Sequence, residues 1–380
     1  MSKVKQSENK RLKNKQLEIK AIKIRGFKSI RDLDLPLNSL NVLIGANGSG
    51  KSNFISLFNL LNRIIEERLQ VFVAQAGGPD SLLHYGQKTT DKLEVKIDFP
   101  PNSYEFSLIP TQDNSLIFDE ETCYFHDPKY EIPCKVDLGG GQKETALNSN
   151  DVEWGQGVIE HVLNSIESWI IYHFHDTSPS SLMKQKGNLD DNLMFRADAA
   201  NLAAYLFLLR EKHRQHYDNI VATVQLAAPF FDDFILRPDP LNPRMIQLEW
   251  REKASDTYFN AHALSDGTLR FICLAVLLLQ PHPPSLILLD EPELGLHPYA
   301  INLLADLLKS AATHTQVIVA TQSVTLVNQF DYPDIIVVER EDRQSVFRQL
   351  KGEDMEHWLD EYGLGDLWEK NVIGGRPAHE

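Results

Sequence analysis

The sequence predicts an α/β fold, and three features of the chain lead to this prediction. A glycine-rich loop at 45–52 lies between an apolar stretch at 40–44 and a segment whose apolar residues recur at helical spacing. A second apolar run at 286–289 ends in two acidic residues. From 265 to 350, helical and strand-like patterns alternate with short connections, which is typical of a sheet covered by helices.

The glycine-rich loop has the pattern of a phosphate-binding loop. It matches GxxxxGK(S/T) between a strand and a helix, with the residues Gly45-Ala46-Asn47-Gly48-Ser49-Gly50-Lys51-Ser52. Glycines allow backbone N–H groups to close around phosphates, and the start of the helix favours anions. We therefore expect Lys51 to reach the β- and γ-phosphates of ATP and the Ser52 hydroxyl to bind Mg²⁺.

The second apolar run ends in carboxylates suited to nucleotide hydrolysis. Asp290 and Glu291 follow a predicted buried strand, and parallel strands present residues at their carboxyl ends to a bound ligand. We expect Asp290 to hold Mg²⁺ through water. Glu291 would act as the general base or would position the attacking water.

Another anion site is predicted where a helix over 268–280 begins. Ser265 and the amide of Gly267 would lie at the N-terminus of this helix, where anions are favoured. Taken alone, the segment is more typical of an ordinary helix cap. The segment lies one helix and one turn before Asp290, and this position relative to the other two motifs favours a functional site.

Composition narrows the class of protein. The chain has a net charge of −15, three cysteines without a CxxC pair, and no apolar run near the ~20 residues of a membrane helix. With no secretory signal sequence, these features predict a cytoplasmic protein. The acidic balance disfavours general nucleic-acid binding, although basic residues within 3–31 leave contact with DNA open.

The pattern along the chain divides it into five expected segments. They are a disordered basic tail at 1–16, the first part of a nucleotide lobe at 17–100, an inserted β/helical lobe at 101–260, the second part of the nucleotide lobe at 261–350, and a C-terminal helix and tail at 351–380. Short strands at 93–125 predict an antiparallel sheet. A long amphipathic helix is expected at 199–224, and surface loops at 138–150 and 178–191.

In this order, the three motifs resemble those of the ABC-type ATPases, and the chain is most similar to their RecF/SMC-like branch. The similarity extends to Arg25-Gly26-Phe27-Lys28-Ser29, to Asn47 and Asn53, and to the run from Asp290 to Pro298. The chain looks like the short stand-alone bacterial ATPases of the OLD/RecF-like group, several of which belong to phage-defence or toxin–antitoxin-like pairs.

The resemblance implies a fold, a ligand set and a mechanism. The fold would be an ABC-type P-loop ATPase head with a mixed β-sheet core, an antiparallel β subdomain and an inserted α-helical lobe. Two protomers would form a homodimer around two ATP molecules, each lying between the phosphate loop of one chain and Ser265 and Gly267 of the other. The nucleotide contacts carried over are Arg25, Lys28, Asn47, Gly48, Ser49, Gly50, Lys51, Ser52, Asn53, Ser265 and Gly267.

Three positions depart from the family pattern or are ambiguous within it. Gln322 stands where the family has a histidine; it can bond a γ-phosphate or water but carries no proton, so we expect slow turnover that is little affected by pH near the histidine range. Asp266 stands where transporters have glycine and is expected to point away, capping the following helix. The remaining metal ligand is assigned to Gln75, with Gln87 as the alternative.

Two further histidines form a weaker candidate site. His173 and His175 would share one face of a strand at 169–174, as a metal pair would, but no third ligand has suitable spacing. Two histidines that simply end a strand are the favoured interpretation.

The sequence therefore predicts a Mg²⁺-dependent ATPase that works as an ATP-dimerised switch. It would control a separately encoded effector, such as a nuclease in phage defence. The alternative is a RecF-like DNA-binding repair or recombination ATPase. The nucleotide-binding subunit of a transporter is disfavoured by the long insertion between the phosphate loop and Ser265.

Overall fold

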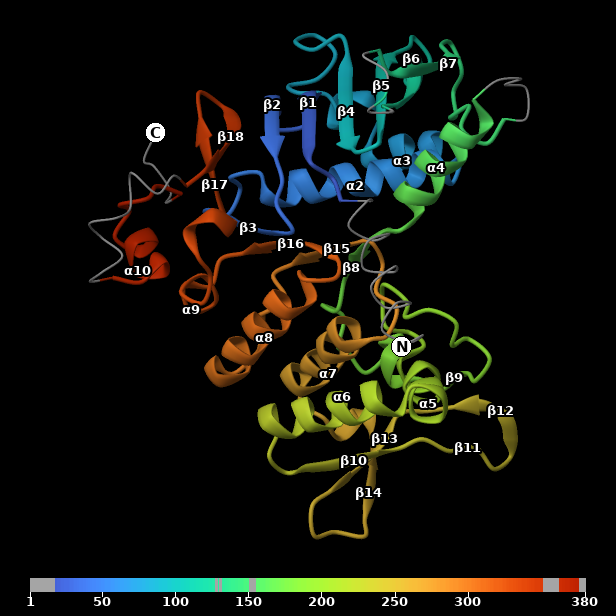
Figure 1. Ribbon diagram of the computed structural model, residues 1–380, viewed down its shortest axis with the longest axis vertical. Helices are drawn as coiled ribbons and strands as arrows, with labels where there is room; N and C mark the ends of the chain where they lie inside the picture. The colour runs from blue at the N-terminus through green and yellow to red at the C-terminus, as the bar shows by residue number, and fades with distance from the viewer. Residues whose placement is uncertain (1–17, 127–128, 130–131, 150–154, 351–361, 376–380) are drawn as a thin grey trace.

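The computed structural model describes residues 18–126, 129, 132–149, 155–350 and 362–375 and contains two six-stranded sheets (Figure 1). The core sheet has the order β18 (Gln344–Gln349), β17 (Ile335–Glu341), β3 (Leu40–Ile44), β16 (Gln316–Thr321), β15 (Leu286–Asp290) and β8 (Trp169–Tyr172). The five strands from β17 to β8 are parallel, and β18 is antiparallel to β17. Their carboxyl ends therefore meet at one edge of the sheet.

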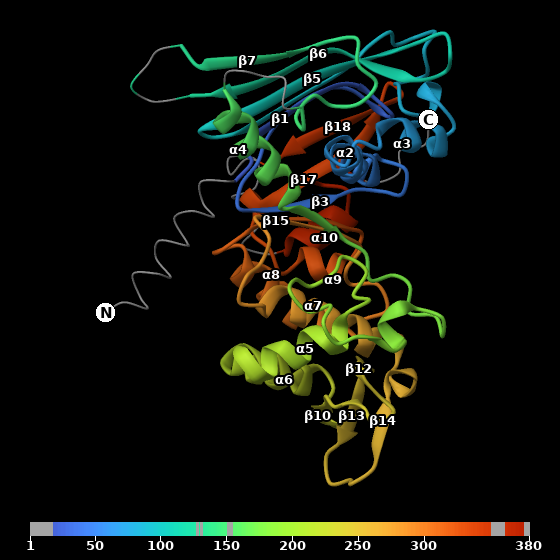
Figure 2. The same cartoon turned by 90° about the vertical axis from the view of Figure 1, so that its right-hand side faces the viewer.

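The second sheet is antiparallel and is joined to the core sheet by a shared hydrophobic layer. Its order is β2 (Ile30–Pro36), β1 (Ala21–Phe27), β4 (Leu93–Phe99), β5 (Asn102–Pro110), β6 (Leu116–Phe125) and β7 (Cys134–Gly139). Helix α2 (Lys51–Ile65) lies between the two sheets, as Figure 2 shows, and α4 (Gln156–Glu167) packs into the same layer. Burial of apolar side chains from both sheets and α2 holds the layers together.

Helices cover the other face of the core sheet. They are α5 (Leu202–Lys212), α6 (Arg214–Ala227), α7 (Asp266–Leu279) and α8 (Pro298–Ala311), with the short α9 (Val324–Val327) and α10 (Leu364–Glu369) near the C-terminal end. Two three-stranded sheets lie beyond α5 and α6 (Figure 1). One contains β10 (Phe231–Ile235), β13 (Glu249–Glu252) and β14 (Tyr258–Asn260), and the other contains β11 (Pro238–Asp239), β12 (Asn242–Ile246) and β9 (Gly187–Asn188).

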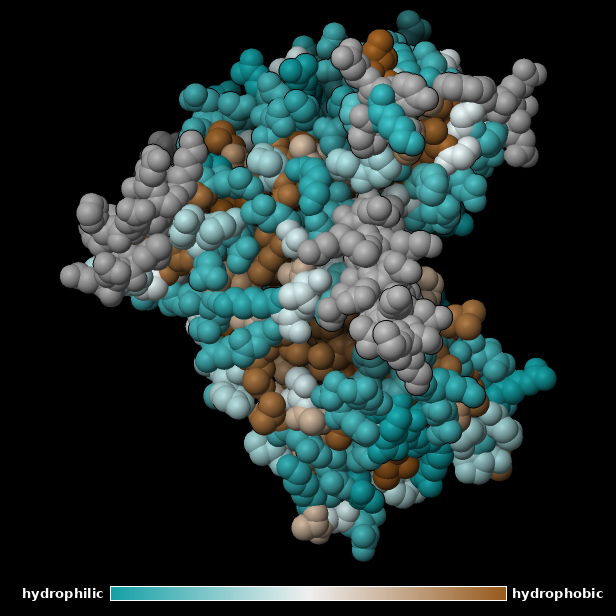
Figure 3. All heavy atoms as spheres, in the orientation of Figure 1, coloured by the Kyte–Doolittle hydropathy of each residue, from teal (hydrophilic) through white to brown (hydrophobic). Residues whose placement is uncertain are grey.

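The molecular surface in the view of Figure 3 is largely hydrophilic. Figure 3 shows hydrophobic residues gathered in the hollow between the stacked sheets and the helices below them. Among the described residues, no helix has both the length and the apolar composition needed to cross a membrane.

The predicted α/β fold, with a mixed core sheet and an antiparallel subdomain, is confirmed, but several elements differ from the prediction. The helix expected at 199–224 is two helices, because the chain breaks at His213 between α5 and α6. The loop expected after 138 is ordered in part: the carboxylate of Glu144 accepts the N–H groups of Leu69 and Gln70 at the start of α3 (Leu69–Ala76). Of the segment at 351–380 that was expected to hold a C-terminal helix, residues 351–361 and 376–380 lie outside the described residues, and α10 lies between them.

The inserted lobe predicted at 101–260 is not one unit. Strands β4 and β5 pair across the expected boundary at residue 100, so β5, β6 and β7 complete the antiparallel sheet. Strand β8 joins the core sheet beside β15. Only the segment from β9 to β14 forms a separate lobe of helices and short strands. The boundary was mispredicted because strand pairing connects distant segments, and no local sequence pattern shows which segments pair.

Candidate functional site

The phosphate loop connects β3 to α2 at the carboxyl edge of the core sheet. Gly48 and Gly50 have left-handed backbones, with φ of 80° and 119°, and Gly50 caps α2. Lys51 is buried, and its Nζ donates to the carbonyl oxygens of Gly45 at 2.6 Å and Ala46 at 3.0 Å. The loop therefore surrounds an ammonium group at the start of a helix, which is the arrangement that binds phosphate.

The residues of the loop fit a nucleotide and its cation. Burial lowers the pKa of Lys51, while the carboxylates of Glu291 and Asp290 act in the opposite direction. The hydroxyl of Ser49 is buried without a hydrogen-bond partner, so a phosphate oxygen would satisfy it. The Ser52 hydroxyl donates to Asp290 Oδ2 at 3.2 Å, which brings together the two predicted Mg²⁺ residues from α2 and β15.

The two acidic residues after β15 have different environments. Burial raises the pKa of Asp290, and the hydrogen bond from Ser52 opposes this shift. Glu291 has a left-handed backbone, with φ of 45°, and its N–H donates to the carbonyl of Ala320 on β16 at 2.8 Å. This bond holds a strained non-glycine conformation, which is common where a side chain is aimed into a site.

Gln322 connects three parts of the site. Its side-chain Nε2 donates to Asn47 Oδ1 at 2.6 Å and also to the carboxylate of Glu291. The side-chain amide of Gln322, the residue after β16, thus joins the phosphate loop to the acidic end of β15. The structure brings Gln322, Glu291 and Asn47 together as the predicted catalytic arrangement requires.

Glu293 is a residue that the sequence analysis did not single out. Its carboxylate accepts bonds from the Thr321 hydroxyl and, at 3.4 Å, from the N–H of Gln322, while its other oxygen is buried without a partner. Burial raises the pKa of Glu293, and the bond from Thr321 opposes the shift. Glu293 therefore determines where the chain leaves β16 and where Gln322 lies. Only its position within the acidic run could have drawn attention to it.

The turn before β2 braces the loop indirectly. Asn53 Nδ2 donates to Ser29 Oγ at 2.7 Å, and the Ser345 hydroxyl on β18 contacts both Ser29 Oγ at 2.6 Å and the Ser49 carbonyl at 2.5 Å. Lys28 Nζ donates to Ser56 Oγ on α2 at 2.6 Å, and burial lowers the pKa of Lys28.

Arg25 belongs to a different surface. It lies on β1, where its guanidinium pairs with Asp32 at 3.2 Å and Glu94 at 3.7 Å. The contacts of Arg25 and Lys28 are thus to other protein groups, and their expected roles as nucleotide ligands stay predictions.

The assignment of Gln75 as a metal ligand does not agree with the geometry. Gln75 is exposed on α3, which follows the C-terminal end of α2 and contacts β6. Ser52 lies in the first turn of α2, whereas α3, which carries Gln75, begins beyond the other end of α2 (Figure 1). The alternative, Gln87, lies in the following turn, where its N–H donates to Asp80 at 2.7 Å.

A histidine directly follows the strand next to β15. Strand β8 pairs in parallel with β15 as far as Tyr172 opposite Leu289, so His173 leaves the end of β8 on the same edge of the sheet as Asp290, the last residue of β15. His173 and His175 lie 6.4 Å apart between ring centroids, and β8 ends before both of them. Their expected place on one strand is therefore corrected to the loop just beyond it. The described residues contain no group of three or more His, Cys, Asp or Glu side chains placed to hold a metal.

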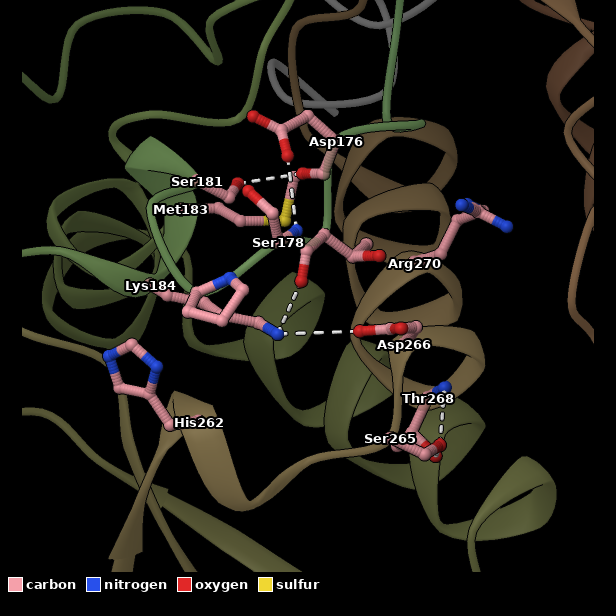
Figure 4. Close-up of polar contacts among 12 residues, drawn as sticks. Asp176, Ser178, Ser181, Met183, Lys184, His262, Ser265, Asp266, Thr268 and Arg270 are labelled. Atoms are coloured by element: carbon pink, nitrogen blue, oxygen red, sulfur yellow. Dashed lines mark hydrogen bonds and ion pairs between the residues drawn. The ribbon is translucent and has the colours of Figure 1, made fainter.

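The second anion site lies at the start of α7 (Figure 4). Ser265 caps the helix: its Oγ accepts the N–H of Thr268 at 3.1 Å. Gly267 has no room for a side chain, because a Cβ there would overlap the carbonyl oxygen of Gly295 in the loop after Glu293. This contact explains the requirement for glycine and links α7 to the loop that follows β15.

Asp266 points away from the helix start but does not cap it. Its carboxylate pairs with the Lys184 ammonium at 3.3 Å, and Lys184 also donates to the Thr177 carbonyl at 2.5 Å (Figure 4). The Lys184 side chain is 6% exposed and that of Asp266 is 67% exposed. The ion pair thus neutralises a buried cation, and the predicted capping role belongs to Ser265.

Arg270 joins α7 to the segment after β8. It is buried, and its guanidinium donates to the carbonyl of Phe174 at 3.1 Å and that of His175 at 3.3 Å. Burial lowers the pKa of Arg270, with the charge of Asp266 acting in the opposite direction. The histidine segment beside Asp290 and the start of α7 are therefore parts of one connected structure.

The helices that begin at the two predicted anion sites pack on opposite faces of the core sheet. Helix α2 packs in the layer between the sheets, whereas α7 packs on the other face with α5, α6 and α8. No hydrogen bond or ion pair among the described residues joins the phosphate loop to Ser265 or Gly267.

Comparisons with known proteins agree with this geometry. Residues 40–328 match the family model described as "AAA domain, putative AbiEii toxin, Type IV TA system". The OLD nuclease of Thermus scotoductus is 23% identical over 345 residues, which cover 84% of this chain and 62% of that protein. The chain thus spans less than two thirds of the length of this curated relative.

Solved structures show a similar fold. An Smc head bound to the C-winged helix domain of ScpA has a TM-score of 0.60 and 17% identity, covering 89% of this chain and 99% of that one. An Smc head with an extended coiled coil, bound to the C-terminal domain of ScpA derived from Pyrococcus furiosus, has a TM-score of 0.54 and 16% identity. It covers 90% of this chain and 98% of its own. The shared architecture is that of an ABC-type ATPase head.

Proposed function

The chain belongs to this AAA-domain family and is an OLD/RecF/SMC-like ATPase, and from that premise we propose that it is an ATP-dimerised switch controlling an effector protein. The observation that carries the proposal is that α2 and α7, whose N-termini are the two predicted anion sites, pack on opposite faces of the core sheet. A second copy related by two-fold symmetry would supply Ser265 and Gly267 to the nucleotide bound at Lys51.

The residues at the phosphate loop have distinct roles in this proposal. Lys51 and the loop amides bind the phosphates, and Ser52 and Asp290 would hold Mg²⁺, which supplies charge neutralisation on the phosphate oxygens. Glu291 accepts a proton from the attacking water, and Gln322 positions Glu291. Because Gln322 cannot take part in proton transfer itself, turnover would be slow.

The output of the switch is proposed to be an effector that acts on nucleic acid. Two comparisons support this: the relative named an OLD nuclease, and the family description that includes a toxin and a Type IV toxin–antitoxin system. Hydrolysis would remove the γ-phosphate contacts that join the two protomers, and the change in their relative position would be read by the effector.

Direct DNA binding, the alternative function, has less support from the described surface. Arginines in the segment from 196 to 214, which could offer a basic surface to DNA, pair with nearby carboxylates. Arg196 pairs with Asp191 at 3.1 Å, and Arg214 pairs with Asp218 at 2.8 Å. Stimulation of ATP hydrolysis by DNA would favour the alternative.

The first test is the mass of the Glu291→Gln variant by light scattering, with and without ATP and Mg²⁺. This substitution retains the hydrogen-bonding shape of the side chain and removes the base, so the ATP-bound state should accumulate. We expect a mass that doubles only with ATP. The matched control adds Lys51→Ala, which should abolish the doubling because the phosphates lose their ammonium partner.

An oligomer whose mass does not change with ATP would contradict the proposal. Nucleotide would then not be part of the interface, and Ser265 and Gly267 would be an ordinary helix cap.

A further inference from the structure

His173 and Asp290 are neighbours at the carboxyl ends of two paired strands. In the parallel register between β8 and β15, Trp169 lies opposite Leu286 and Tyr172 lies opposite Leu289. Asp290 is the last residue of β15, and His173 directly follows the end of β8. Residues at matching positions of adjacent strands lie about 5 Å apart and share a face of the sheet.

The shared face is the one that α2 covers. Alternate residues of the two strands, Trp169 and Ile171 on β8 and Leu286 and Leu288 on β15, pack in the same hydrophobic layer as α2. Continuing the alternation by two residues places His173 and Asp290 on this side. Ser52, in the first turn of α2, already bonds to Asp290 there at 3.2 Å.

The imidazoles are accessible and act electrostatically on Asp290. His173 and His175 are both exposed, and each interacts with the Asp290 carboxylate. Arg270 holds the intervening backbone by bonding the carbonyls of Phe174 and His175. The histidine segment is therefore positioned at the edge of the nucleotide site by a buried contact from α7.

We propose that His173 supplies an imidazole ligand to the divalent cation that Ser52 and Asp290 would hold with the nucleotide, and that this ligand makes the site favour Mn²⁺ or Co²⁺ over Mg²⁺. The inference rests on the proposed nucleotide function. Among the described residues, the site has fewer than three metal-binding His, Cys, Asp or Glu side chains. Phosphate oxygens and water would complete the coordination, as is usual for a cation that binds with ATP.

The expected metal preference follows from the ligand atom. Carboxylate, hydroxyl and phosphate ligands are oxygens, which suit Mg²⁺, whereas an imidazole nitrogen binds Mn²⁺ and Co²⁺ more strongly. A glutamine at the same position would offer oxygen again. His173→Gln should therefore reduce the preference for Mn²⁺ over Mg²⁺, measured as the ratio of half-saturating concentrations for nucleotide binding, by about tenfold.

His173 is assigned the role because it directly follows Tyr172, the last residue of β8 that pairs with β15, whereas His175 lies two residues further along the loop. The charge of His175 nevertheless lowers the pKa of Asp290 more than that of His173 does, so the experiment must separate the two. The two histidines can be separated by matched substitutions to glutamine. His161, an exposed histidine on α4, is the control for the loss of an imidazole elsewhere on the surface.

The test uses full-length Glu291→Gln protein, in which hydrolysis is blocked, labelled with ¹⁵N-histidine and mixed with ATP and Mn²⁺. Pulsed electron paramagnetic resonance reports ¹⁵N nuclei bound directly to Mn²⁺, and the label excludes nitrogen from the nucleotide. We expect a ¹⁵N coupling that His173→Gln abolishes and that His175→Gln and His161→Gln retain.

Two results would overturn the inference in distinguishable ways. A Mn²⁺–ATP complex without ¹⁵N coupling, or a coupling that only His175→Gln removes, would contradict the assignment of His173 and leave the nucleotide function standing. Failure to bind Mn²⁺ and Mg²⁺ with ATP at all would contradict the proposed function together with the inference.

Discussion

The amide of Gln322 donates a hydrogen bond to Asn47 Oδ1 at 2.6 Å, although 275 positions separate the two residues in the sequence. The same amide bonds to Glu291, so the phosphate loop and the acidic strand end respond to one side chain. A γ-phosphate bound at the loop would compete for these bonds. The contact is thus a route by which nucleotide occupancy reaches the proposed general base.

We expect Gln322→Ala to lower the turnover number on the order of 10²-fold while leaving ATP affinity within a few-fold, because Glu291 loses the group that orients it. Steady-state hydrolysis and titration with a fluorescent ATP analogue would measure the two effects. Gln349→Ala, which removes a bond from β18 to the Pro36 carbonyl, is the control. Unchanged turnover in Gln322→Ala would show that the amide has no part in hydrolysis.

Gln322→His should add a titration near pH 6.5 to the rate, since it introduces an imidazole at the position where the related family carries one. The rate of ATP hydrolysis is measured across pH for the variant and the wild type, and the ratio of the two rates is compared. Any titration of His173 and His175 occurs in both proteins and cancels in this ratio. A ratio that does not vary with pH would argue against proton transfer at position 322.

Glu293→Gln should raise the thermal midpoint of the nucleotide-free protein at neutral pH. Because burial raises the pKa of Glu293, the folded state binds its proton more tightly than the unfolded chain does. Ionisation therefore costs stability as pH rises from the unfolded value, about 4.3, through the raised folded value. The amide lacks this cost, so its advantage should shrink as pH falls toward 4.

Calorimetry at several pH values would measure the Glu293 effect, with the exposed Glu160→Gln on α4 as control. If the thermal midpoints of wild type and variant coincide at every pH, the hydrogen bonds of the Glu293 carboxylate fully offset the cost of burying its charge.

The ion pair of Lys184 and Asp266 predicts unequal effects of its two neutralising substitutions. Asp266→Asn leaves a buried ammonium without its carboxylate, so we expect a loss of about 1–3 kcal/mol in the free energy of unfolding. Lys184→Met leaves an exposed carboxylate and should cost less. Adding Lys184→Met to Asp266→Asn should recover part of the loss in denaturant unfolding. Equal losses with no recovery would exclude charge burial as the cause.

The same pair predicts an effect on assembly. Lys184→Met leaves the Asp266 charge beside the proposed phosphate site at Ser265, so it should weaken ATP-dependent association of Glu291→Gln protein by about tenfold or more. Adding Asp266→Asn to the Lys184→Met, Glu291→Gln protein should restore the ATP-dependent association. Association that is insensitive to both changes would remove the α7 N-terminus from the interface.

Gly267→Ala should impair ATP-dependent association without abolishing nucleotide binding, because the added Cβ would displace the loop at Gly295. The matched control is Gly157→Ala on α4, where a Cβ meets no atom within 4 Å and alanine favours the helix by about 0.5–1 kcal/mol. Light scattering and nucleotide titration would measure the pair. Identical behaviour of the two variants would contradict the close contact.

The features that the sequence determined by itself are local. The phosphate loop, the acidic end of β15 and the start of a helix just after Ser265 each depend on residues within a few positions of one another, so their patterns predict their structures. The identity of the capping residue, Ser265 rather than Asp266, came from the structure. The order of these motifs also predicted the ATPase fold class. The break between α5 and α6 was missed because no glycine or proline marks it in the sequence.

Only the tertiary structure decided which distant residues meet. The pairing of β8 with β15 brings the segment that begins at His173 to the sheet edge that holds Asp290, whereas Gln75, which the sequence analysis had assigned as a metal ligand, lies on α3. The burial of Glu293 and the pairing of Lys184 with Asp266 likewise depend on how strands and helices pack. Strand pairing and side-chain burial are properties of segments far apart in the chain, and no local periodicity encodes which segments become neighbours.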